Sequence, residues 1–516
     1  MCCGKENMSE LWILSPALLA AGAGIVLLIW SFAEHLRDGG GANTEKESHS
    51  GKVHGIALGA LLAASVLALA AAWSGDKSVT LFHLMPDIPI CFRIDDIGRW
   101  FVTMVTAVWV LVGIYSTVYM RHEGEEKRFF GLYVLLYGVL VCLDFAGNLV
   151  TMYLCYELMT MVSFVLVMHN GSREAIMAAL KYLFYSLCGA YMGLFGIYFL
   201  YRHCDSLTFQ PGGTLSPEAV GTHGGILLLV VFLMLLGFGA KAGMFPLHAW
   251  LPAAHPVAPS PASAVLSGVI VKSGVLAIIR VVFYIVGADF LRGTWVQYTW
   301  LALTLVTVFM GSLLAYREPV LKKRLAYSTV SQVSYILFGL ALLSPTGFAG
   351  ALLHLAFHAV VKCGLFLAAG IFLVCCHRTR VEELAGLGRR MPAVLWCFAI
   401  LSLSLIGIPP TSGFVSKWYL AQGALEAGVG AWGYWGIAVL LVSALLTAGY
   451  LLPVVTKGFF PGAADGGETA QDERREPPAA MLIPLILLAV LALGMGLLPG
   501  FFTDYVGGIA ALALQM

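Results

Sequence analysis

The chain has 516 residues, of which 59% are hydrophobic and only 11% are charged. In soluble domains about a quarter of the residues are usually charged. This composition therefore excludes a chain of soluble domains and predicts an integral membrane protein surrounded by lipid. The 30 Lys and Arg nearly balance the 29 Asp and Glu, giving a net charge of +1, so we also expect no nucleic-acid partner.

Long apolar runs predict transmembrane helices, because a helix needs about 20 apolar residues to cross a bilayer. Fourteen such runs occur, at 11–33, 55–73, 100–119, 130–146, 149–168, 176–201, 224–250, 260–287, 298–316, 325–344, 347–375, 393–423, 432–455 and 481–500. The first run has no basic segment before it and no convincing cleavage site after it, so it is expected to be a helix and not a signal peptide. We therefore predict an all-α polytopic membrane protein with about 14 transmembrane helices.

The distribution of cations among the loops predicts the orientation of the chain. The loops after odd-numbered runs hold 18 cations: Arg37, Lys46, Lys52, Arg121, Lys127, Arg128, Arg173, Arg317, Lys322, Lys323, Arg324, Arg378, Arg380, Arg389, Arg390, Lys457, Arg474 and Arg475. The opposite side holds 6: Lys5, Lys77, Arg93, Arg99, Arg202 and Arg292. The first side is therefore expected to be cytoplasmic, with both termini on the extracytoplasmic side of a prokaryotic inner membrane.

The remaining 6 cations lie inside predicted helices: Lys181, Lys241, Lys272, Arg280, Lys362 and Lys417. A charged lysine at a helix centre costs about 2.5–3.5 kcal/mol, so such residues usually mark an ion pathway. Lys181 and Arg280 lie near helix ends, where an interfacial position is an equal alternative. A single carboxylate, Glu157, stands in the middle of a run, whereas Asp144 near a helix end is expected to be interfacial. A buried lysine beside a movable carboxylate can load and release a proton.

Histidines extend this polar series, because their side chains exchange protons near neutral pH. His354, His358 and Lys362 follow at successive four-residue steps, which places them on one face of the eleventh helix. His248 lies near the end of the seventh predicted helix, and His255 lies between the seventh and eighth. The 11 cysteines are scattered, and the pairs Cys2-Cys3 and Cys375-Cys376 are adjacent, unlike spaced metal ligands. We expect buried free thiols, no metal site, no haem and no other cofactor.

Two runs contain helix-breaking residues beside a lysine. Lys241 precedes Pro246 in the seventh helix, and Lys417 follows Pro409 and Pro410 in the twelfth. Proline removes a helical hydrogen bond, which membranes tolerate only where protein or water replaces it. The two breaks lie five helices apart, so we predict discontinuous helices 7 and 12 within two inverted five-helix repeats, a pattern typical of transporters.

The predicted organisation divides the chain into four parts. Residues 1–128 form three N-terminal helices, 129–290 the first repeat with helices 4–8, 291–460 the second repeat with helices 9–13, and 461–516 a cytoplasmic loop with helix 14.

Several segments resemble one known family. The segments are Tyr156-Glu157-Leu, Lys241-Ala-Gly-Met-Phe-Pro-Leu-His-Ala-Trp-Leu-Pro-Ala-Ala-His with the following Ala258-to-Gly274 block, Leu325-Ala-Tyr-Ser-Thr-Val-Ser-Gln-Val, His354-Leu-Ala-Phe-His-Ala-Val-Val-Lys, Gly386-Leu-Gly-Arg-Arg-Met-Pro and Gly413-Phe-Val-Ser-Lys. Together they resemble the antiporter-like subunits of respiratory complex I (NADH-quinone oxidoreductase), Mrp-type Na⁺/H⁺ antiporters (their D-type member) and membrane-bound energy-converting hydrogenases. The resemblance covers about 145–420. Only 16 residues follow the last predicted helix, so the long arm of the largest complex I member is not expected.

The resemblance implies a proton relay and assigns its residues. Glu157 and Lys241 would form a carboxylate–lysine pair, Lys272 the connecting lysine, His354 and His358 the central histidines, and Lys417 the terminal group. His248 and Lys362 are weaker candidates. No catalytic, cofactor-binding or metal-binding residue is implied.

The function expected from these features is proton translocation, with Na⁺/H⁺ antiport left open, by a non-catalytic subunit of an oxidoreductase or antiporter complex. Its expected partners are other membrane subunits, including further antiporter-like subunits. Two alternatives remain: a stand-alone secondary transporter of a small solute, and a structural membrane subunit whose polar residues only hold helices together.

Overall fold

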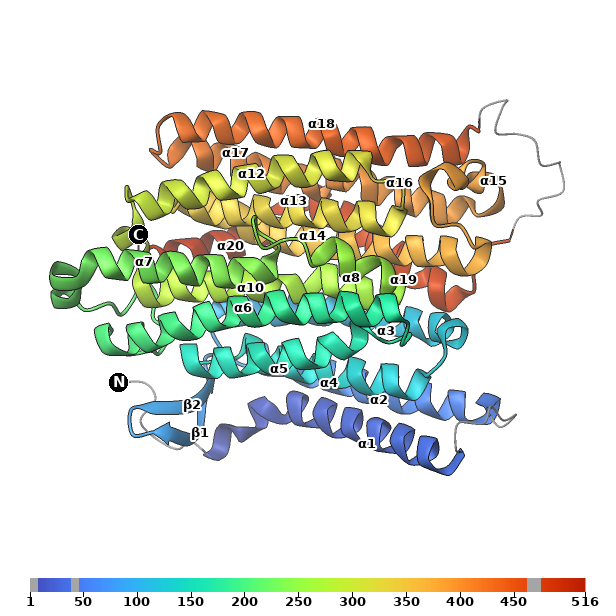
Figure 1. Ribbon diagram of the computed structural model, residues 1–516, viewed down its shortest axis with the longest axis horizontal. Coiled ribbons are helices and arrows are strands. Elements are labelled where there is room, and N and C mark those ends of the chain that lie inside the picture. Colours follow the sequence, from blue (N-terminus) through green and yellow to red (C-terminus); the bar gives the residue numbers. More distant parts are fainter. Residues whose placement is uncertain (1–7, 39–45, 462–474, 516) are drawn as a thin grey trace.

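The computed structural model describes residues 8–38, 46–461 and 475–515 and shows a bundle of long, nearly parallel helices (Figure 1). Cys2, Cys3, Lys5 and Arg474 lie outside the described residues, as do the side chains of Arg37 and Lys46. The chain begins with η1 Met8–Leu14, α1 Ser15–Asp38, α2 Lys46–Ala72, β1 Ser78–Met85, β2 Ile88–Arg93 and α3 Asp96–Glu123.

Strands β1 and β2 form an antiparallel hairpin between α2 and α3, which was not predicted from the sequence. The segment is too short to span a bilayer and has no helical apolar period, so a search for long apolar runs passes over it.

The next helices contain the first three predicted relay residues, Glu157, Lys241 and Lys272. They are α4 Glu126–Asp144, α5 Leu149–Val167, α6 Arg173–His203, α7 Pro217–Ala242, α8 Leu251–Val257, α9 Ser260–Val265, the π-helical turn η2 Leu266–Ile270, α10 Val271–Val281, the π-helical turn η3 Val282–Val286 and α11 Ala288–Leu291. Helix α7 ends at the left-handed Gly243, and α8 resumes eight residues later.

The second half of the chain contains the remaining helices, with His354 and His358 on α14 and Lys417 on α17. Its elements are α12 Trp295–Arg317, α13 Leu321–Ala341, α14 Pro345–Cys376, η4 Val381–Leu384, α15 Leu387–Arg390, α16 Pro392–Ile406, α17 Ser412–Glu426, α18 Ala431–Phe459, α19 Ala479–Leu497 and α20 Pro499–Ala513. Helix α16 ends at the left-handed Gly407. In both halves a proline, Pro246 or Pro410, stands three residues after the left-handed glycine.

Eleven helical segments of the described residues are long and apolar enough to cross a membrane. This result confirms a predominantly helical, multi-pass membrane protein. The predicted runs at 130–146, 325–344 and 393–423 correspond to α4, α13 and the pair α16 and α17, which do not meet that length and composition test. Charged residues near both ends of α4 lower its mean hydropathy, and three consecutive cations near the start of α13 have the same effect there. Helices α16 and α17 are too short, with 15 residues each.

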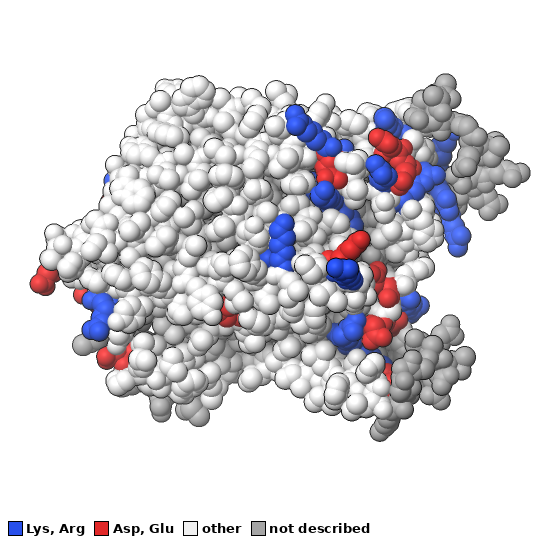
Figure 2. All heavy atoms as spheres, in the orientation of Figure 1, with Lys and Arg blue, Asp and Glu red and all other residues white. Residues whose placement is uncertain are grey.

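Charged side chains gather at one end of the bundle. Figure 2 shows Lys and Arg concentrated at the end where α15 lies, whereas the middle of the visible face is almost free of charge. The hairpin lies at the opposite end, where η1 packs against β1. The C-terminal helix α20 ends there as well, since Gln515 donates to the carbonyl of Pro211 at 2.6 Å.

Helix α14 lies at the centre of the second half. It packs against α13, α16, α17, α19 and α20, and across the bundle against α3 and α9. Every residue from Gly347 to Phe372 is buried, so all faces of this helix contact protein. A polar side chain on α14 therefore has no lipid-facing position, and its hydrogen-bonding groups must be satisfied inside the bundle.

A close approach between α7 and α10 depends on Gly274. A Cβ atom at this position would lie 2.5 Å from the carbonyl oxygen of Phe238 and 3.1 Å from the Cβ of Lys241. We expect Gly274→Ala to lower the thermal stability of the detergent-purified chain, because overpacking costs about 1–3 kcal/mol. The control is Gly59→Ala in α2, where a Cβ would meet nothing within 4 Å. Equal melting temperatures for both variants would contradict this prediction.

Candidate functional site

Lys241 is fully buried at the C-terminal end of α7 and is held by hydroxyl groups of α5 and α6. Its Nζ donates to Thr160 Oγ1 at 2.8 Å, to Tyr182 OH at 2.7 Å and to Ser186 Oγ at 3.3 Å. Tyr182 OH in turn shares a 2.7 Å hydrogen bond with Ser163 Oγ. The ammonium group is therefore surrounded by neutral groups that can both accept and donate a proton.

Glu157 lies on α5, one helical turn before Thr160. Its Oε1 is buried and has no hydrogen-bond partner among the described residues. Lys241 is the charged group that acts on it electrostatically. Nevertheless, no ion pair within 4.0 Å joins these two side chains among the described residues. The carboxylate and the ammonium group are thus neighbours without direct contact, and the pair is open in this structure.

Lys272 follows the π-helical turn η2 and is fully buried. Its Nζ donates to the carbonyl oxygen of Ser267 at 2.6 Å. Ser267 Oγ shares a 2.6 Å hydrogen bond with Thr329 Oγ1 of α13. Single π-helical turns disturb the regular backbone ladder and are common at functional sites. Here the turn supplies the carbonyl that receives the lysine and joins α10 to the second half of the chain.

His354 and His358 lie one turn apart on α14, with exposed fractions of 3% and 2%. Their rings are stacked, with centroids 6.0 Å apart. His354 Nδ1 hydrogen-bonds to Ser416 Oγ of α17 at 2.9 Å. Both ring nitrogens of His358, and Nε2 of His354, lack a protein partner within the described parts of the chain. Since unpaired buried polar atoms are costly, these nitrogens are suited to water or to a migrating proton.

Lys362 completes the stripe that the sequence predicted on this helix. It is fully buried, and its Nζ donates to the carbonyl oxygen of Leu325 at 2.9 Å and to Ser328 Oγ, both on α13. Lys272 and Lys362 both act electrostatically on His358. The structure therefore brings the connecting lysine, the weaker candidate Lys362 and the histidines into one buried region.

Lys417 stands near the start of α17 and reaches back to the end of α16. Its Nζ donates to the carbonyl oxygens of Leu405 at 2.7 Å and Ile406 at 2.8 Å. The C-terminal carbonyls of a helix carry partial negative charge and favour a cation. The same Nζ lies 5.1 Å from the ring centroid of Tyr335. Its chain neighbour Ser416 binds His354, so α17 connects the terminal lysine with the histidines.

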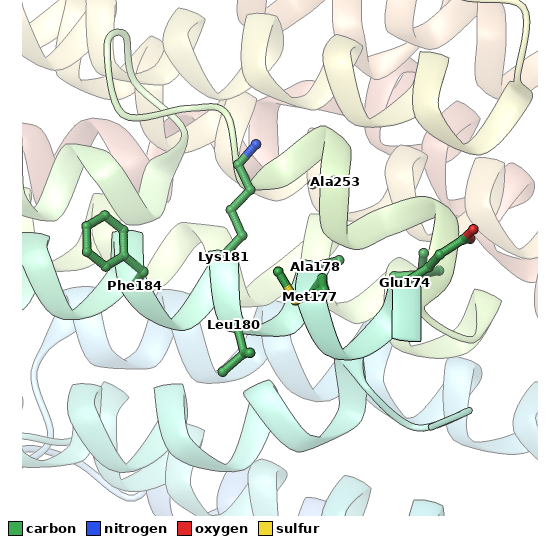
Figure 3. A pocket seen from close by; sticks show the side chains of 8 residues that line it. Glu174, Met177, Ala178, Leu180, Lys181, Phe184 and Ala253 are labelled. Atoms are coloured by element: carbon green, nitrogen blue, oxygen red, sulfur yellow. The ribbon is translucent and has the colours of Figure 1, made fainter. Parts of the chain in front are cut away.

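Two polar residues of the predicted spans lie apart from this series. Lys181 is exposed on α6, and Figure 3 shows its side chain rising from α6 towards α8, in an open groove also lined by Glu174 and Ala253. His248 is half-buried between α7 and α8, and its Nδ1 has no partner among the described residues. His255 is fully buried and stacks on Phe366 at 4.8 Å.

Arg280 and Asp144, which the sequence placed near helix ends, both lie inside the protein. Both are buried, with exposed fractions of 1% and 2%. Arg280 forms two hydrogen bonds with Asp95, the N-cap of α3, at 2.5 and 2.8 Å. This pair ties α10 to α3.

The hydroxyl groups that hold the lysines were not predicted from the sequence. The hydroxyls of Thr160, Tyr182 and Ser186 hold Lys241, and that of Ser328 holds Lys362. Ser416 Oγ instead bonds His354, and Ser267 accepts from Lys272 through its backbone carbonyl. One signal was available, since Thr160 stands three residues after Glu157 and therefore shares its helix face. Among the described residues, no group of three or more His, Cys, Asp or Glu could hold a metal ion.

Comparison with known proteins assigns the chain to a family. Residues 146–447 match the model described as NADH:quinone oxidoreductase/Mrp antiporter, transmembrane. Residues 85–130 match the model of the N-terminus of chain 5 of NADH-ubiquinone oxidoreductase (complex I). The first match covers more than half of the chain and contains all the predicted relay residues.

Individual relatives agree with this assignment. The chain is 33% identical to NADH-quinone oxidoreductase subunit N of Desulforudis audaxviator, over 78% of this chain and 81% of the relative. It is 30% identical to the D-type member of the Na⁺/H⁺ antiporter of Bacillus subtilis, over 89% and 90% of the two chains. Its fold matches a chain of the archaeal membrane-bound sulfane sulfur reductase with a TM-score of 0.82 at 22% identity, covering 98% of both chains. The chain therefore belongs to the NADH:quinone oxidoreductase/Mrp antiporter family of membrane subunits.

Proposed function

We propose that this chain translocates protons as one membrane subunit of a larger complex I-like, Mrp-like or energy-converting hydrogenase complex. One observation carries the proposal. Lys241, Lys272, Lys362 and Lys417 are held by hydroxyl or carbonyl oxygens and lack a carboxylate within ion-pair distance among the described residues. Structural lysines inside proteins are usually paired with an anion. Four buried lysines that are held by neutral oxygens, without a paired anion, are suited to binding and releasing protons.

The proposed path begins at the cytoplasmic side near Lys272, crosses the middle of the membrane and leaves by Lys417. Lys241 belongs to the same series, since α7 and α10 touch at Gly274, two residues after Lys272. His358 and His354 lead from Lys272 and Lys362 towards Ser416 and Lys417. The cation-rich end of the bundle is the proposed cytoplasmic side, which places both termini outside.

Glu157 is the proposed control element of the path. When the carboxylate contacts Lys241, the lysine keeps its proton, and when the two separate, burial favours release of that proton. The open pair in this structure represents the second condition. A charge moved in a neighbouring subunit would shift the balance between the two conditions, because coupling between sites is reciprocal.

The finer architecture is part of this proposal. We propose fourteen transmembrane helices, divided into the parts 1–128, 129–290, 291–460 and 461–516. We also propose that the two middle parts are inverted repeats in which helices 7 and 12 are discontinuous, which accounts for the breaks after α7 and α16. The shared spacing of Gly243 to Pro246 and of Gly407 to Pro410 supports the repeats. In that alignment Lys241 corresponds to Leu405, whose carbonyl receives the ammonium group of Lys417. The two lysines thus mark matching ends of two half-helices.

We expect Glu157→Gln to suppress proton translocation while the complex still assembles, because glutamine keeps the shape but loses the charge that acts on Lys241. Translocation is measured as acidification of inverted membrane vesicles that contain the tagged complex, and assembly by native electrophoresis. The matched control is Glu174→Gln on the exposed face of α6, which should translocate normally. Full translocation by Glu157→Gln would remove Glu157 from the path.

Two further measurements separate the proposal from its alternatives. Affinity purification of the tagged chain should recover other membrane subunits, and the redox or small Mrp-type subunits among them would identify the complex. The chain alone, reconstituted in liposomes, should not accumulate a solute. Solute uptake by the isolated chain would instead favour a stand-alone secondary transporter, and normal proton translocation by all relay variants would favour a structural subunit.

A further inference from the structure

The last apolar segment of the chain is broken near its middle. Helix α19 Ala479–Leu497 lies towards the cation-rich end of the bundle, and α20 Pro499–Ala513 lies towards the hairpin end (Figure 1). Leu498 alone separates them, with φ −121° and ψ 57°. Pro499 has no N–H group, so the hydrogen-bond ladder of α19 cannot continue through it. The sequence predicted one helix at 481–500 without this break.

The break lies against the linker between α16 and α17. A Cβ atom on Gly496 would lie 2.2 Å from the carbonyl oxygen of Pro410 and 2.5 Å from the backbone nitrogen of Ser412. These are backbone atoms, which cannot rotate out of the way as a side chain can, so only glycine fits here. Two residues earlier, a Cβ atom on Gly494 would meet nothing within 4 Å. Of these two neighbouring glycines, only Gly496 contacts the linker.

The linker determines how Lys417 meets the end of α16. Lys417 Nζ donates to the carbonyl oxygens of the last two residues of α16, at 2.7 and 2.8 Å. On the other side of the linker, Ser412 Oγ hydrogen-bonds to Ser404 Oγ at 3.1 Å, and the Gly413 N–H donates to the same oxygen at 3.3 Å. The first turn of α17 is thus fastened to the last turn of α16, and the path of residues 407–411 sets the distance between the two carbonyls and the lysine.

The start of α20 is held against the central helix α14. Phe502 packs edge-to-face on Phe357, with ring centroids 6.0 Å apart, and Phe357 lies between the two histidines in the sequence of α14. Trp100 of α3 also lies edge-on to Phe502, at 6.5 Å. The broken helix is therefore fixed on both sides of its break, by Gly496 on the linker and by Phe502 on α14.

We propose that the break between α19 and α20 positions Lys417 for proton exchange, with Gly496 as the positioning residue that fixes the linker. The inference deepens the proposed function and rests on it. In that function Lys417 gives a proton to water on the far side and regains one from the side of the histidines, so its Nζ alternates between the neutral and the charged form. The two carbonyls of α16 carry the partial negative charge of a helix C-terminus. A fixed linker keeps them aimed at the ammonium group each time it forms, so the site is not rebuilt in every cycle.

Close helix packing explains only part of this contact. Glycines let membrane helices approach each other, and such a contact stabilises the bundle whichever face it lies on. Gly496, however, meets residues 410–412, where the span that carries Lys417 is interrupted, and Phe502 meets the helix that carries the histidines. A packing role predicts only lower stability when the contact is disturbed. A positioning role also predicts a change in the way Lys417 exchanges its proton.

Gly496→Ala in the assembled complex tests the proposal, with Gly494→Ala as the matched control. The added methyl group forces the linker to move, and a displacement of about 1 Å can cost about 10²-fold in rate. Acidification of inverted membrane vesicles should therefore fall by about tenfold or more in Gly496→Ala. It should remain normal in Gly494→Ala, and native electrophoresis should show equal assembly of both variants.

The pH profile of translocation separates positioning from a loss of active complex. With the carbonyls displaced, the charged form of Lys417 loses its acceptors, so translocation by Gly496→Ala should decline at a lower pH than wild-type translocation. His354 and His358 of α14 and Tyr335 of α13 face Lys417 and stay in place in this variant. Fewer active complexes would lower the rate by one factor at every pH. That result would overturn the proposal, as would normal translocation.

Phe502→Leu decides the question should Gly496→Ala not assemble. It loosens α20 from α14 without adding an atom at the linker, and it should shift the pH profile in the same direction. Phe501→Leu is its control, because Phe501 is 75% exposed. An unchanged profile in Phe502→Leu would then overturn the proposal. Normal translocation by Lys417→Ala would instead overturn the proposed function itself, whereas loss in Lys417→Ala with normal translocation by Gly496→Ala would remove only this inference.

Discussion

Replacing Lys241 with alanine should abolish proton translocation by the complex while leaving the complex intact. Lys241 is the only ionisable group that contacts Thr160 and Tyr182 directly among the described residues. Without it, the site holds only neutral hydroxyls, which relay a proton but do not store one. The loss of a positioned proton carrier typically costs about 10²-fold or more, so the residual rate should be close to background. Vesicle acidification measures this rate.

The complex should tolerate this substitution because the lysine is not part of a buried ion pair. Removing the ammonium group relieves the cost of burying a charge. The hydroxyls left behind have other partners, as the 2.7 Å bond between Tyr182 and Ser163 already shows. The redox or exchange activity of partner subunits, and migration on native gels, should therefore be retained.

Lys181→Ala is the matched control for Lys241→Ala. It removes the same side chain from an exposed position on α6, beside the groove in Figure 3. Translocation should be unchanged. Undiminished acidification by Lys241→Ala, in vesicles that contain the same amount of chain, would remove Lys241 from the proton path.

The ionisable residues of the site could be predicted from the sequence because charge inside an apolar helix is rare and costly. Each of Lys241, Lys272, Lys362 and Lys417 stands out in a run of apolar residues, and spacing alone placed His354 and His358 on one face. The structure confirms that these two rings are stacked neighbours.

The partners of those residues could not be predicted, since serine, threonine and tyrosine occur commonly in membrane helices. Whether Thr160 or Ser416 contacts a lysine or a histidine depends on how α5 meets α7 and how α17 meets α14. The expected contact between Glu157 and Lys241 illustrates the same limit. Both residues lie in the right region, yet the ammonium group is bound by hydroxyls in this structure. The π-helical turn before Lys272 has no local sequence signal either.

Replacing Arg280 with methionine should lower the stability of the chain by about 1–3 kcal/mol, because it removes the main partner of the half-buried carboxylate of Asp95 and leaves only Arg93 close to it. The guanidinium contacts both oxygens of Asp95, at 2.5 and 2.8 Å, and lies over the rings of Phe209 and Tyr284. Burial alone would raise the pKa of Asp95, but Arg280 and Arg93 lower it, so the carboxylate is charged at neutral pH. Thermal unfolding of the detergent-purified chain measures the loss.

Two comparison variants make this prediction specific. Asp95→Asn combined with Arg280→Met should recover much of the stability, because the amide oxygen of asparagine can still accept the hydrogen bond from the Gly98 backbone that caps α3. Arg292→Ala, which breaks an exposed pair with Asp289, should have little effect because surface ion pairs contribute little. If the double variant were less stable than Arg280→Met alone, the loss would come from the packing of the guanidinium against the two rings and not from the unpaired charge of Asp95.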